Sequence, residues 1–235
     1  NTVKSNGTAI TTIYGRQGSE TGMLELNGGS YDKYPIEEGV AYAAPAEGYK
    51  IEENENGTYG VVEDPAYGKV AKIGDTYYAT LADAHAAAVE GDVIKMLVDL
   101  EMDKTFTISK NITFDGNNKT LTSSSQNPQI GIEVKSSATI QNITVKSVGN
   151  SYGSDTRAIN LNGNATSVVL DNVTLESSKA ICVAPGAKTE SLYIKNNSVL
   201  TASDDVVNCE ATSAPVVTIE NSTLNAMKCC GHTAS

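Results

Sequence analysis

Several residue types are scarce in this sequence. There is no Trp, and Phe and His occur only twice each among 235 residues. Seventeen Lys and Arg stand against 28 Asp and Glu, which gives a formal net charge of -11. This shortage of positive charge argues against a nucleic-acid-binding surface and against binding to an anionic membrane, because both need clustered basic side chains. No apolar run approaches the roughly 20 residues of a membrane-spanning helix, so we expect no membrane insertion.

The remaining composition is typical of a folded, secreted protein. Hydrophobic residues make up 40% of the chain, which is too high for a fully disordered one. A low Lys and Arg content with abundant Ser, Thr and Asn favours secretion. The sequence begins with Asn1 and has no signal peptide, as expected for a mature product or a piece of a longer chain. Four Cys do not make a disulfide scaffold in a chain of this length.

The first third of the sequence predicts two segments. Residues 1–32 are expected to form short strands separated by Gly turns. Residues 33–79 are Tyr-rich, and two β-hairpins are predicted there because Asn-Gly and Gly-Asp turns separate β-forming runs. The expected hairpins pair Tyr49–Glu52 with Thr58–Val62, and Val70–Ile73 with Thr76–Ala79.

One helix is predicted, over Leu81–Val89. Thr80 is placed to cap it and Asp83 follows three residues later, which approaches a capping box. The Ala-rich composition favours the helix, and Gly91 is expected to stop it. Its apolar stripe is predicted to consist of Leu81, Ala84, Ala88 and Val89.

Residues 104–235 contain an internal repeat, in which a short apolar strand is followed by Asn. The repeated residues are Asn117, Asn142, Asn172, Asn196 and Asn221, at intervals of 25, 30, 24 and 25 positions. A second short strand falls within each interval. A period near 25 built from short strands predicts a β-solenoid, because one coil cannot bury its apolar face until neighbours stack on it. The recurring Asn predicts an asparagine ladder at one corner of the coils.

A stack of coils has two open ends, and open ends expose unpaired strand edges. The predicted helix precedes the first coil, so we expect it to cover that end. The predicted fold class is therefore all-β: a right-handed parallel β-helix over residues 80–235, with one capping α-helix and a small β-hairpin segment before it.

The start of this region resembles a known family. Residues 80–94 and 103–117 are similar to the opening of bacterial secreted right-handed parallel β-helix proteins, which are pectate-lyase-like surface proteins and adhesins. Residues 28–49 and 56–59 resemble the segment that closes such modules. The resemblance implies a bacterial cell-surface setting and modules arranged in tandem.

The order of the segments is unusual for that family, because here the closing segment comes first. One interpretation is a slice of a tandem array. The other is head-to-tail assembly, in which residues 1–32 of one chain complete the unfinished last coils of another by strand addition and build a filament. The edge residues expected to join are Ile10, Ile13, Leu24, Leu26, Cys229 and Cys230.

No complete catalytic set is predicted. Asp155 and Arg157 are close in sequence, and we expect a solvated charge pair in a loop. Asp204-Asp205 followed by His232 resembles part of a polygalacturonase-like motif, but the other acidic and basic residues of that motif are missing. Hydrolysis with inversion needs an acid and a base on opposite sides of the bond, so Asp204-Asp205 is expected to be a turn.

The cysteines fall on successive predicted coils, at Cys182, Cys209 and Cys229-Cys230. We expect stacked small core residues, and a disulfide from Cys209 to Cys229 or Cys230 stays open geometrically. Their spacing does not predict a zinc site. His85 is expected to pack within the helical cap rather than bind a ligand, and no metal or cofactor is predicted.

The sequence thus favours a non-enzymatic, secreted protein, a structural or adhesive β-solenoid module at a bacterial cell surface. Its expected partners are further copies of itself, glycans or a host surface. The alternative is a carbohydrate-binding or polysaccharide-degrading β-helix module. A structural module predicts interaction sites at the two ends of the solenoid, whereas an enzyme predicts a groove of acids and aromatics on one face.

Overall fold

The computed structural model describes residues 24–32, 34–35, 43–124, 129–147, 155–165 and 167–226. These residues belong to two compact units, Asn1–Gly68 and Lys69–Ser235. Each unit has its own hydrophobic core, a small cluster in the first and an extended one in the second.

The described residues of the first unit form five short strands: β1 (Leu24–Leu26), β2 (Ser30–Tyr31), β3 (Ala43–Pro45), β4 (Tyr49–Glu53) and β5 (Tyr59–Glu63). β1 and β3 pair in parallel, while β2, β5 and β4 form an antiparallel sheet. β4 and β5 confirm the first predicted hairpin, and Gly57 in its turn has a φ of 76°. Leu26, Tyr31 and Val61 form the buried core of this unit.

The second unit begins with the second predicted hairpin and the helix, and a long run of strands follows. Its elements are β6 (Ala71–Ile73), β7 (Thr76–Tyr78), α1 (Leu81–Ala87), β8 (Val93–Met96), β9 (Leu100–Met102), β10 (Phe106–Ile108), β11 (Ile112–Ser123), β12 (Gln129–Val134), β13 (Ala138–Ser147), β14 (Thr156–Leu161), β15 (Ser167–Ser177), β16 (Lys179–Val183), β17 (Ser191–Lys195), β18 (Val199–Ala202), β19 (Val207–Cys209), β20 (Val216–Ile219) and β21 (Thr223–Ala226).

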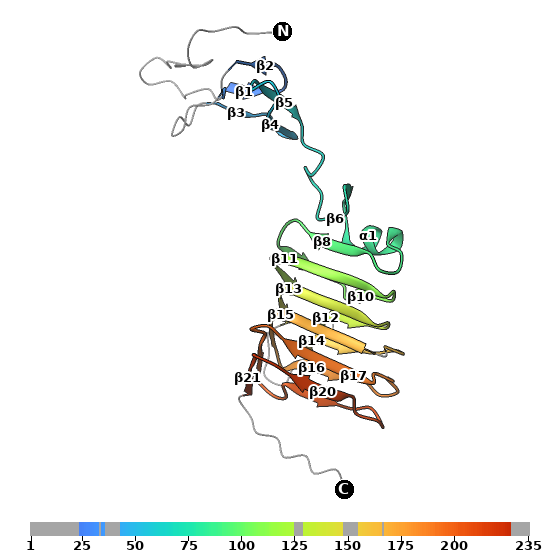
Figure 1. Cartoon of the computed structure of the whole chain (residues 1–235). Coiled ribbons are helices and arrows are strands. Elements are labelled where there is room, and N and C mark those ends of the chain that lie inside the picture. The colour runs from blue at the N-terminus through green and yellow to red at the C-terminus, as the bar shows by residue number, and fades with distance from the viewer. Residues whose placement is uncertain are drawn as a thin grey trace, which may run out of the picture. The chain divides into compact units, whose positions relative to one another are not determined.

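The strands after α1 stack as parallel coils (Figure 1). One sheet, here called the long sheet, runs in the order β20-β17-β15-β13-β11-β8-β6-β7, with β9, β18 and β21 alongside. The other, the five-stranded sheet, runs in the order β10-β12-β14-β16-β19. The pairs are parallel from β8 onward because each coil returns the chain to the same direction one layer further on. This arrangement is a β-solenoid, and it confirms the predicted fold class.

Like residues stack on like inside the solenoid. One column consists of residues each in register with the next: Phe114, Ile140, Leu170, Ile194 and Ile219. The first four side chains are fully buried, whereas Ile219 on the last described coil is 44% exposed. Burying a side chain of this size contributes about 1.5–3 kcal/mol. The coil that carries Ile219 therefore has less of this stabilisation than the coils before it.

α1 confirms the predicted helix with one difference. The Thr80 hydroxyl accepts a hydrogen bond from the Asp83 backbone N–H at 3.0 Å, as the capping pattern predicts. Leu81, Ala84 and Ala88 are buried, but the expectation for Val89 is wrong, because Val89 is 65% exposed. The helix ends at Ala87 and Ala88 has an extended ψ of 146°, so Val89 no longer continues the helical stripe.

The β6–β7 hairpin extends the long sheet beyond β8. Ala71 pairs with Met96 and Lys72 pairs with Lys95, both in antiparallel register. Ala71 is fully buried in the core of the solenoid. The hairpin that the sequence grouped with the Tyr-rich residues 33–79 therefore contributes to the second unit.

Candidate functional site

The five asparagines of the predicted ladder occupy one corner of the coil. Their φ values are 52°, 51°, 54°, 55° and 46° for Asn117, Asn142, Asn172, Asn196 and Asn221, respectively. This corner lies inside β11, β13 and β15, and it separates β17 from β18 and β20 from β21. Left-handed backbone is unfavourable for most side chains and is tolerated by Asn, which explains why Asn recurs there.

Side-chain hydrogen bonding along this corner is mixed. Asn172 Nδ2 donates to Asn142 Oδ1 at 2.9 Å, which is the amide-to-amide contact that a ladder predicts. Asn142 donates instead to Asp115, at 3.3 Å, and Asn196 donates to Asp171, at 2.8 Å. In the described residues the column is thus a stack of left-handed corners with one amide-to-amide contact.

A second polar column, which the sequence analysis missed, lies at another turn of the coil. Ser123, Ser147 and Ser177 are buried at the ends of β11, β13 and β15. Their hydroxyls donate to backbone carbonyl oxygens of β12 and β16 at 3.0, 2.8 and 2.6 Å. They satisfy polar backbone groups that would otherwise be buried at the turn. The recurrence of Ser at intervals of 24 and 30 positions was the available signal.

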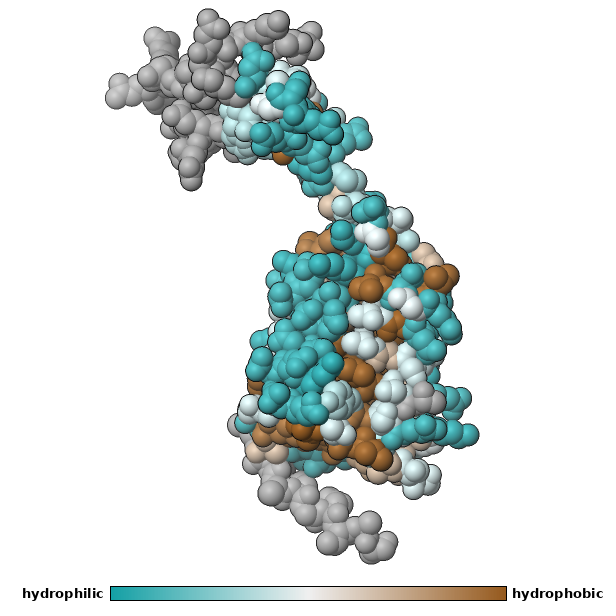
Figure 2. Space-filling view, in the orientation of Figure 1, coloured by the Kyte–Doolittle hydropathy of each residue, from teal (hydrophilic) through white to brown (hydrophobic). Residues whose placement is uncertain are grey.

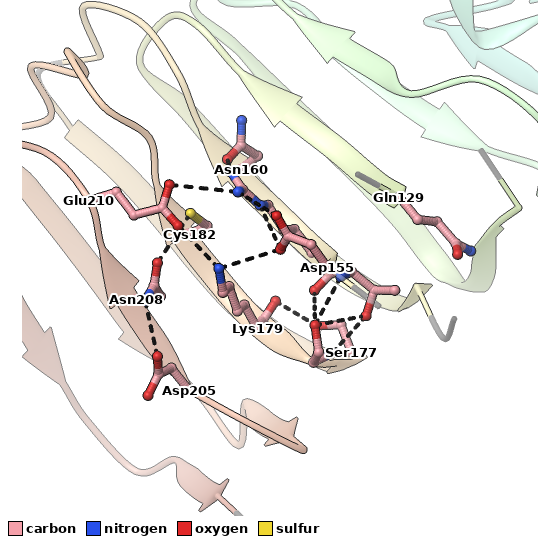
Figure 3. Close-up of polar contacts among 12 residues, drawn as sticks. Gln129, Asp155, Asn160, Ser177, Lys179, Cys182, Asp205, Asn208 and Glu210 are labelled. Carbon is pink, nitrogen blue, oxygen red and sulfur yellow. Dashed lines mark hydrogen bonds and ion pairs between the residues drawn. The ribbon is translucent and has the colours of Figure 1, made fainter. Parts of the chain in front are cut away.

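A charged cluster on the outer face of the five-stranded sheet includes Asp155, Lys179 and Glu210 (Figure 3). Arg157 belongs to this cluster through its contacts with Asp155 and Glu210. Its guanidinium donates to both carboxylate oxygens of Asp155, at 3.2 Å from Nε and 2.8 Å from Nη2. Lys179 stands in register with Arg157 on the next coil, and its Nζ lies 3.4 Å from Asp155 and 3.1 Å from Glu210. Glu210 lies directly after β19, so the two cations and two anions link three successive strands of the sheet.

The expectation of a solvated pair at Asp155 and Arg157 is wrong. Arg157 lies within β14, and only 12% of its side chain is exposed. The hydrogen bonds from Arg157 lower the pKa of the Asp155 carboxyl, although the partial burial of Asp155 opposes this shift. The predicted site residues did not include Lys179 or Glu210, although the repeat pattern places Lys179 opposite Arg157. Because the four charges pair with one another, the cluster joins neighbouring coils.

Cys182 lies beside this cluster on the same face (Figure 3). It is in register with Asn208, and its Sγ lies 3.6 Å from Asn208 Oδ1. The expectation of stacked core cysteines is wrong for Cys209, which is exposed, but Cys182 is fully buried. Burial raises the pKa of its thiol to about 11. Cys209 is exposed, and both cysteines are free thiols.

Asp204 and Asp205 precede β19 in an irregular segment, in agreement with the predicted turn. The Asp204 backbone N–H donates to the Ser178 carbonyl oxygen at 2.9 Å, and Asp205 accepts from Asn208 Nδ2 at 3.0 Å. His232, the other member of the hydrolase-like motif, lies outside the described residues. In the described ranges, no group of three or more His, Cys, Asp and Glu residues is placed to hold a metal ion.

Two of the six residues predicted to form an assembly edge are described. Leu24 belongs to β1, whose backbone pairs with β3. Leu26 is 6% exposed and packs with Tyr31 and Val61 in the core of the first unit, so its side chain is not free to join another chain. The other four, Ile10, Ile13, Cys229 and Cys230, lie outside the described residues.

Exposed large hydrophobic side chains mark the two ends of the solenoid. In the described part of the second unit they are Val89, Val93 and Val98 near its first coil, and Val216, Val217, Ile219 and Leu224 on its last. The described residues of the coils between have none. Hydrophobic side chains gather at the end that carries β20, as Figure 2 shows. No described strand pairs with the outer edge of β20 or β21.

No family model matches the sequence, and no curated protein or solved structure matches it. Within the described ranges, no helix is long and apolar enough to span a membrane. The geometry defines the class of the second unit as a β-solenoid that has a helix and a hairpin at its first coil and exposed apolar side chains on its last described coil.

Proposed function

We propose that this chain is a non-enzymatic, secreted module, a structural or adhesive β-solenoid of a bacterial surface that associates end to end through its last coil. The observation that carries the proposal is the position of the exposed apolar side chains. They lie at the first and last described coils, where a module that works through its ends needs them. The outer face between the ends carries mutually paired charges instead.

The last described coil has both parts of a surface for strand addition. β20 presents a backbone edge of the kind that an incoming strand extends by main-chain hydrogen bonds. Val217 and Ile219 are in register with the fully buried Leu192 and Ile194, but they are 38% and 44% exposed. Covering them would remove apolar surface from water, which contributes about 25 cal/mol for each Å² buried.

The proposed occupant is a segment of a second copy of the chain. Leu26 is part of the core of its own unit, so the segment proposed to add to β20 is residues 1–23, which include Ile10 and Ile13. Each copy carries a formal charge of -11, and like charges oppose association. We therefore expect association to strengthen with ionic strength, as screening shortens the reach of that repulsion.

The test is sedimentation equilibrium of the purified chain over a range of protein and salt concentrations. The chain should form larger species as either concentration rises. Replacing Val217 and Ile219 together by Lys should abolish them, because both side chains point toward the core columns. Replacing Val216 and Thr218 together by Lys is the matched control, since it adds the same charge to the same strand on its outer face.

Removing residues 1–23 leaves β1 intact and identifies the occupant. Loss of the larger species in this deletion supports strand addition by a second copy. A chain that stays monomeric under all conditions, or that associates equally well with Lys at 217 and 219, overturns the proposal. Circular dichroism of each variant establishes that the solenoid is still folded.

A second candidate function is glycan binding by the first unit. Tyr34 and Tyr67 are 51% and 49% exposed there, and the Tyr34 ring meets Tyr59 edge-on at a centroid distance of 5.4 Å. An exposed Tyr ring that is held in place by a neighbouring ring can stack on the apolar face of a sugar. A glycan array probed with the wild type and with Tyr34→Ala and Tyr67→Ala tests it, and binding that is unchanged in both variants would exclude these rings.

A further inference from the structure

Different elements lie at the first edges of the two sheets of the solenoid. The long sheet is extended beyond β8 by the β6–β7 hairpin. The five-stranded sheet begins at β10, and no described strand pairs with the outer edge of β10. α1 packs against β10, β6 and β7. The helix is therefore the element that covers the first strand of the five-stranded sheet.

α1 is held by few apolar contacts and by a set of polar ones. It has seven residues, too short to be stable as an isolated helix in water. Its buried side chains are those of Leu81 and Ala84, followed by Ala88 at the cap. Because Ala side chains are small, the apolar contribution is modest, and the polar contacts at the end of the helix become important for holding α1 in place.

Those polar contacts come from the segment between β10 and β11. Lys110 Nζ donates to the carbonyl oxygens of His85, Ala86 and Ala88 at 2.8, 2.8 and 2.6 Å. These are carbonyl groups that the end of a helix leaves without partners. The Ser109 backbone N–H donates to His85 Nε2 at 3.1 Å. We call Ser109, Lys110 and the groups they bind on α1 the α1 latch.

The His85 contact requires a neutral imidazole. Nε2 accepts the Ser109 hydrogen bond through its lone pair, so the ring is neutral with its proton on Nδ1. Protonation of Nε2 would remove the acceptor and would leave two N–H groups facing each other. The ring also lies edge-on to Phe106, with centroids 6.1 Å apart. Phe106 belongs to β10, so the same imidazole contacts both the covered strand and the segment that follows it.

Burial of the ring and, next, the positive charge of Lys110 lower the pKa of His85 from its ordinary value. The dipole of α1 would favour a cation in its last turn, but the net shift is downward. Asp83 on the same helix is bonded to the Thr80 hydroxyl. The hairpin against the helix carries Lys72, Asp75, Tyr77 and Tyr78, and none of these contributes to the shift.

We propose that the α1 latch is an acid-sensitive closure over the edge of β10, which is fastened while His85 is neutral and released when His85 is protonated. This inference concerns the first coil and does not depend on association through the last one. The direction of the pH effect follows from the lowered pKa of His85. The released state binds the proton more tightly than the fastened state, so acid favours release. The stabilisation of the fastened latch begins to be lost as the pH falls through about 6.5, the ordinary pKa of His.

The experiment is hydrogen exchange of the whole chain at pH 7.5 and pH 5.0, expressed as protection factors so that intrinsic pH effects cancel. In the wild type, protection in α1 and β10 should fall by at least about threefold at pH 5.0, while β13 stays protected and reports the fold. His85→Gln is the matched control, because its side-chain oxygen can accept the Ser109 hydrogen bond but does not titrate. Protection in this variant should be the same at both pH values.

Lys110→Met provides an independent measurement. It removes the three bonds to the helix carbonyls, so protection of α1 should fall at pH 7.5 as well. The proposal is overturned if wild-type protection does not change with pH, if His85→Gln loses protection as the wild type does, or if Lys110→Met leaves α1 fully protected. Exchange of α1 and β10 is measured separately from molecular mass, so this result and that for end-to-end association are distinguishable.

Discussion

Asn172 donates its side-chain amide to Asn142 at 2.9 Å from the equivalent corner one coil further on. Both residues have left-handed backbone, with φ values of 54° and 51°. The backbone conformation is common to all five repeated asparagines, whereas the amide-to-amide contact occurs at this one pair among the described residues. The recurring Asn therefore serves first to turn the chain and second to link the coils.

Asn142 separates these two roles experimentally. Asn142→Ala keeps a side chain at a left-handed corner and loses both side-chain hydrogen bonds, so we expect it to lower the free energy of unfolding by about 2–3 kcal/mol. Asn142→Gly loses the same bonds but has no penalty for positive φ, so its cost should be about 1 kcal/mol. Urea unfolding measures both, and equal costs for Ala and Gly would show that backbone strain is not the reason for Asn.

Gly116 tests how closely the coils approach at this corner. A Cβ added to Gly116 would lie 2.4 Å from Ile143 Cβ and 2.7 Å from the carbonyl oxygen of Asn142, on the next coil. Gly116→Ala should therefore destabilise the solenoid by about 2 kcal/mol or more, since part of the obstruction is backbone that cannot move aside. Gly60→Ala is the control, because its nearest contacts are ordinary, at 3.6 Å. Thermal unfolding that is unaffected by Gly116→Ala would contradict the close approach.

Removing one charged side chain from the cluster should lower the free energy of unfolding more than removing one from an exposed ion pair. Arg157→Met removes the partner of a partly buried Asp155 and should lower the free energy of unfolding by about 2 kcal/mol. Lys146→Met is the matched control, because Lys146 and Glu176 are 41% and 39% exposed at a separation of 3.1 Å. That change should cost less than about 1 kcal/mol. Similar costs for the two variants, measured by urea unfolding, would mean that the cluster contributes no more than a surface pair.

The same cluster predicts how stability depends on acid. The pKa of Asp155 is lowered in the folded chain, chiefly by its hydrogen bonds from Arg157, so the unfolded chain binds the proton more tightly. Its contribution to stability is complete above about pH 4 and is lost as the pH falls through the folded pKa. Asp155→Asn should flatten the pH dependence of the unfolding midpoint below pH 4. An unchanged slope would place the acid-labile groups elsewhere.

Cys182 and Cys209 should differ sharply in reactivity. The Cys182 thiol is buried and has a pKa of about 11, whereas Cys209 is exposed. Since the thiolate is the reactive form, a thiol reagent at pH 8 should modify Cys209 at least about 100-fold faster than Cys182. The measurement uses a chain with Ser at positions 229 and 230 and follows each site by peptide mass mapping. Comparable modification rates for the two thiols would show that the structure around Cys182 readily exposes this side chain to the reagent.

Much of the fold was predictable because a periodic sequence has a periodic structure. The spacing of Asn117 and its equivalents predicted the coils and their corner, and Thr80 with Asp83 predicted the start of α1. The charged cluster was not predictable in this way. The residues next to Asp155 and Arg157 in sequence favour a loop, whereas the burial of these two residues depends on side chains contributed by other coils. Those contacts depend on the register between strands of neighbouring coils and not on the local sequence pattern.

The same limit applies to the cap and to the chain ends. The contact of Lys110 with the carbonyls of α1 joins residues 22–25 positions apart and depends on the path of the chain around the first coil. Leu26 has the pattern of an edge residue, yet the first unit folds over it. Secretion, adhesion and assembly stay predictions, because a β-solenoid is compatible with structural and enzymatic roles alike.

The direction of the hydrogen bonds between coils has a mechanical consequence. These bonds run along the axis of the stack, so a pulling force applied along that axis would open them in sequence rather than shear them all together. Coils would then peel off one at a time, beginning with the coil whose apolar residues are least covered. With 24 to 30 residues between corners, each coil would release about 80–100 Å of extended chain. Such a unit would behave under tension as a tether that lengthens in steps and absorbs work at each one.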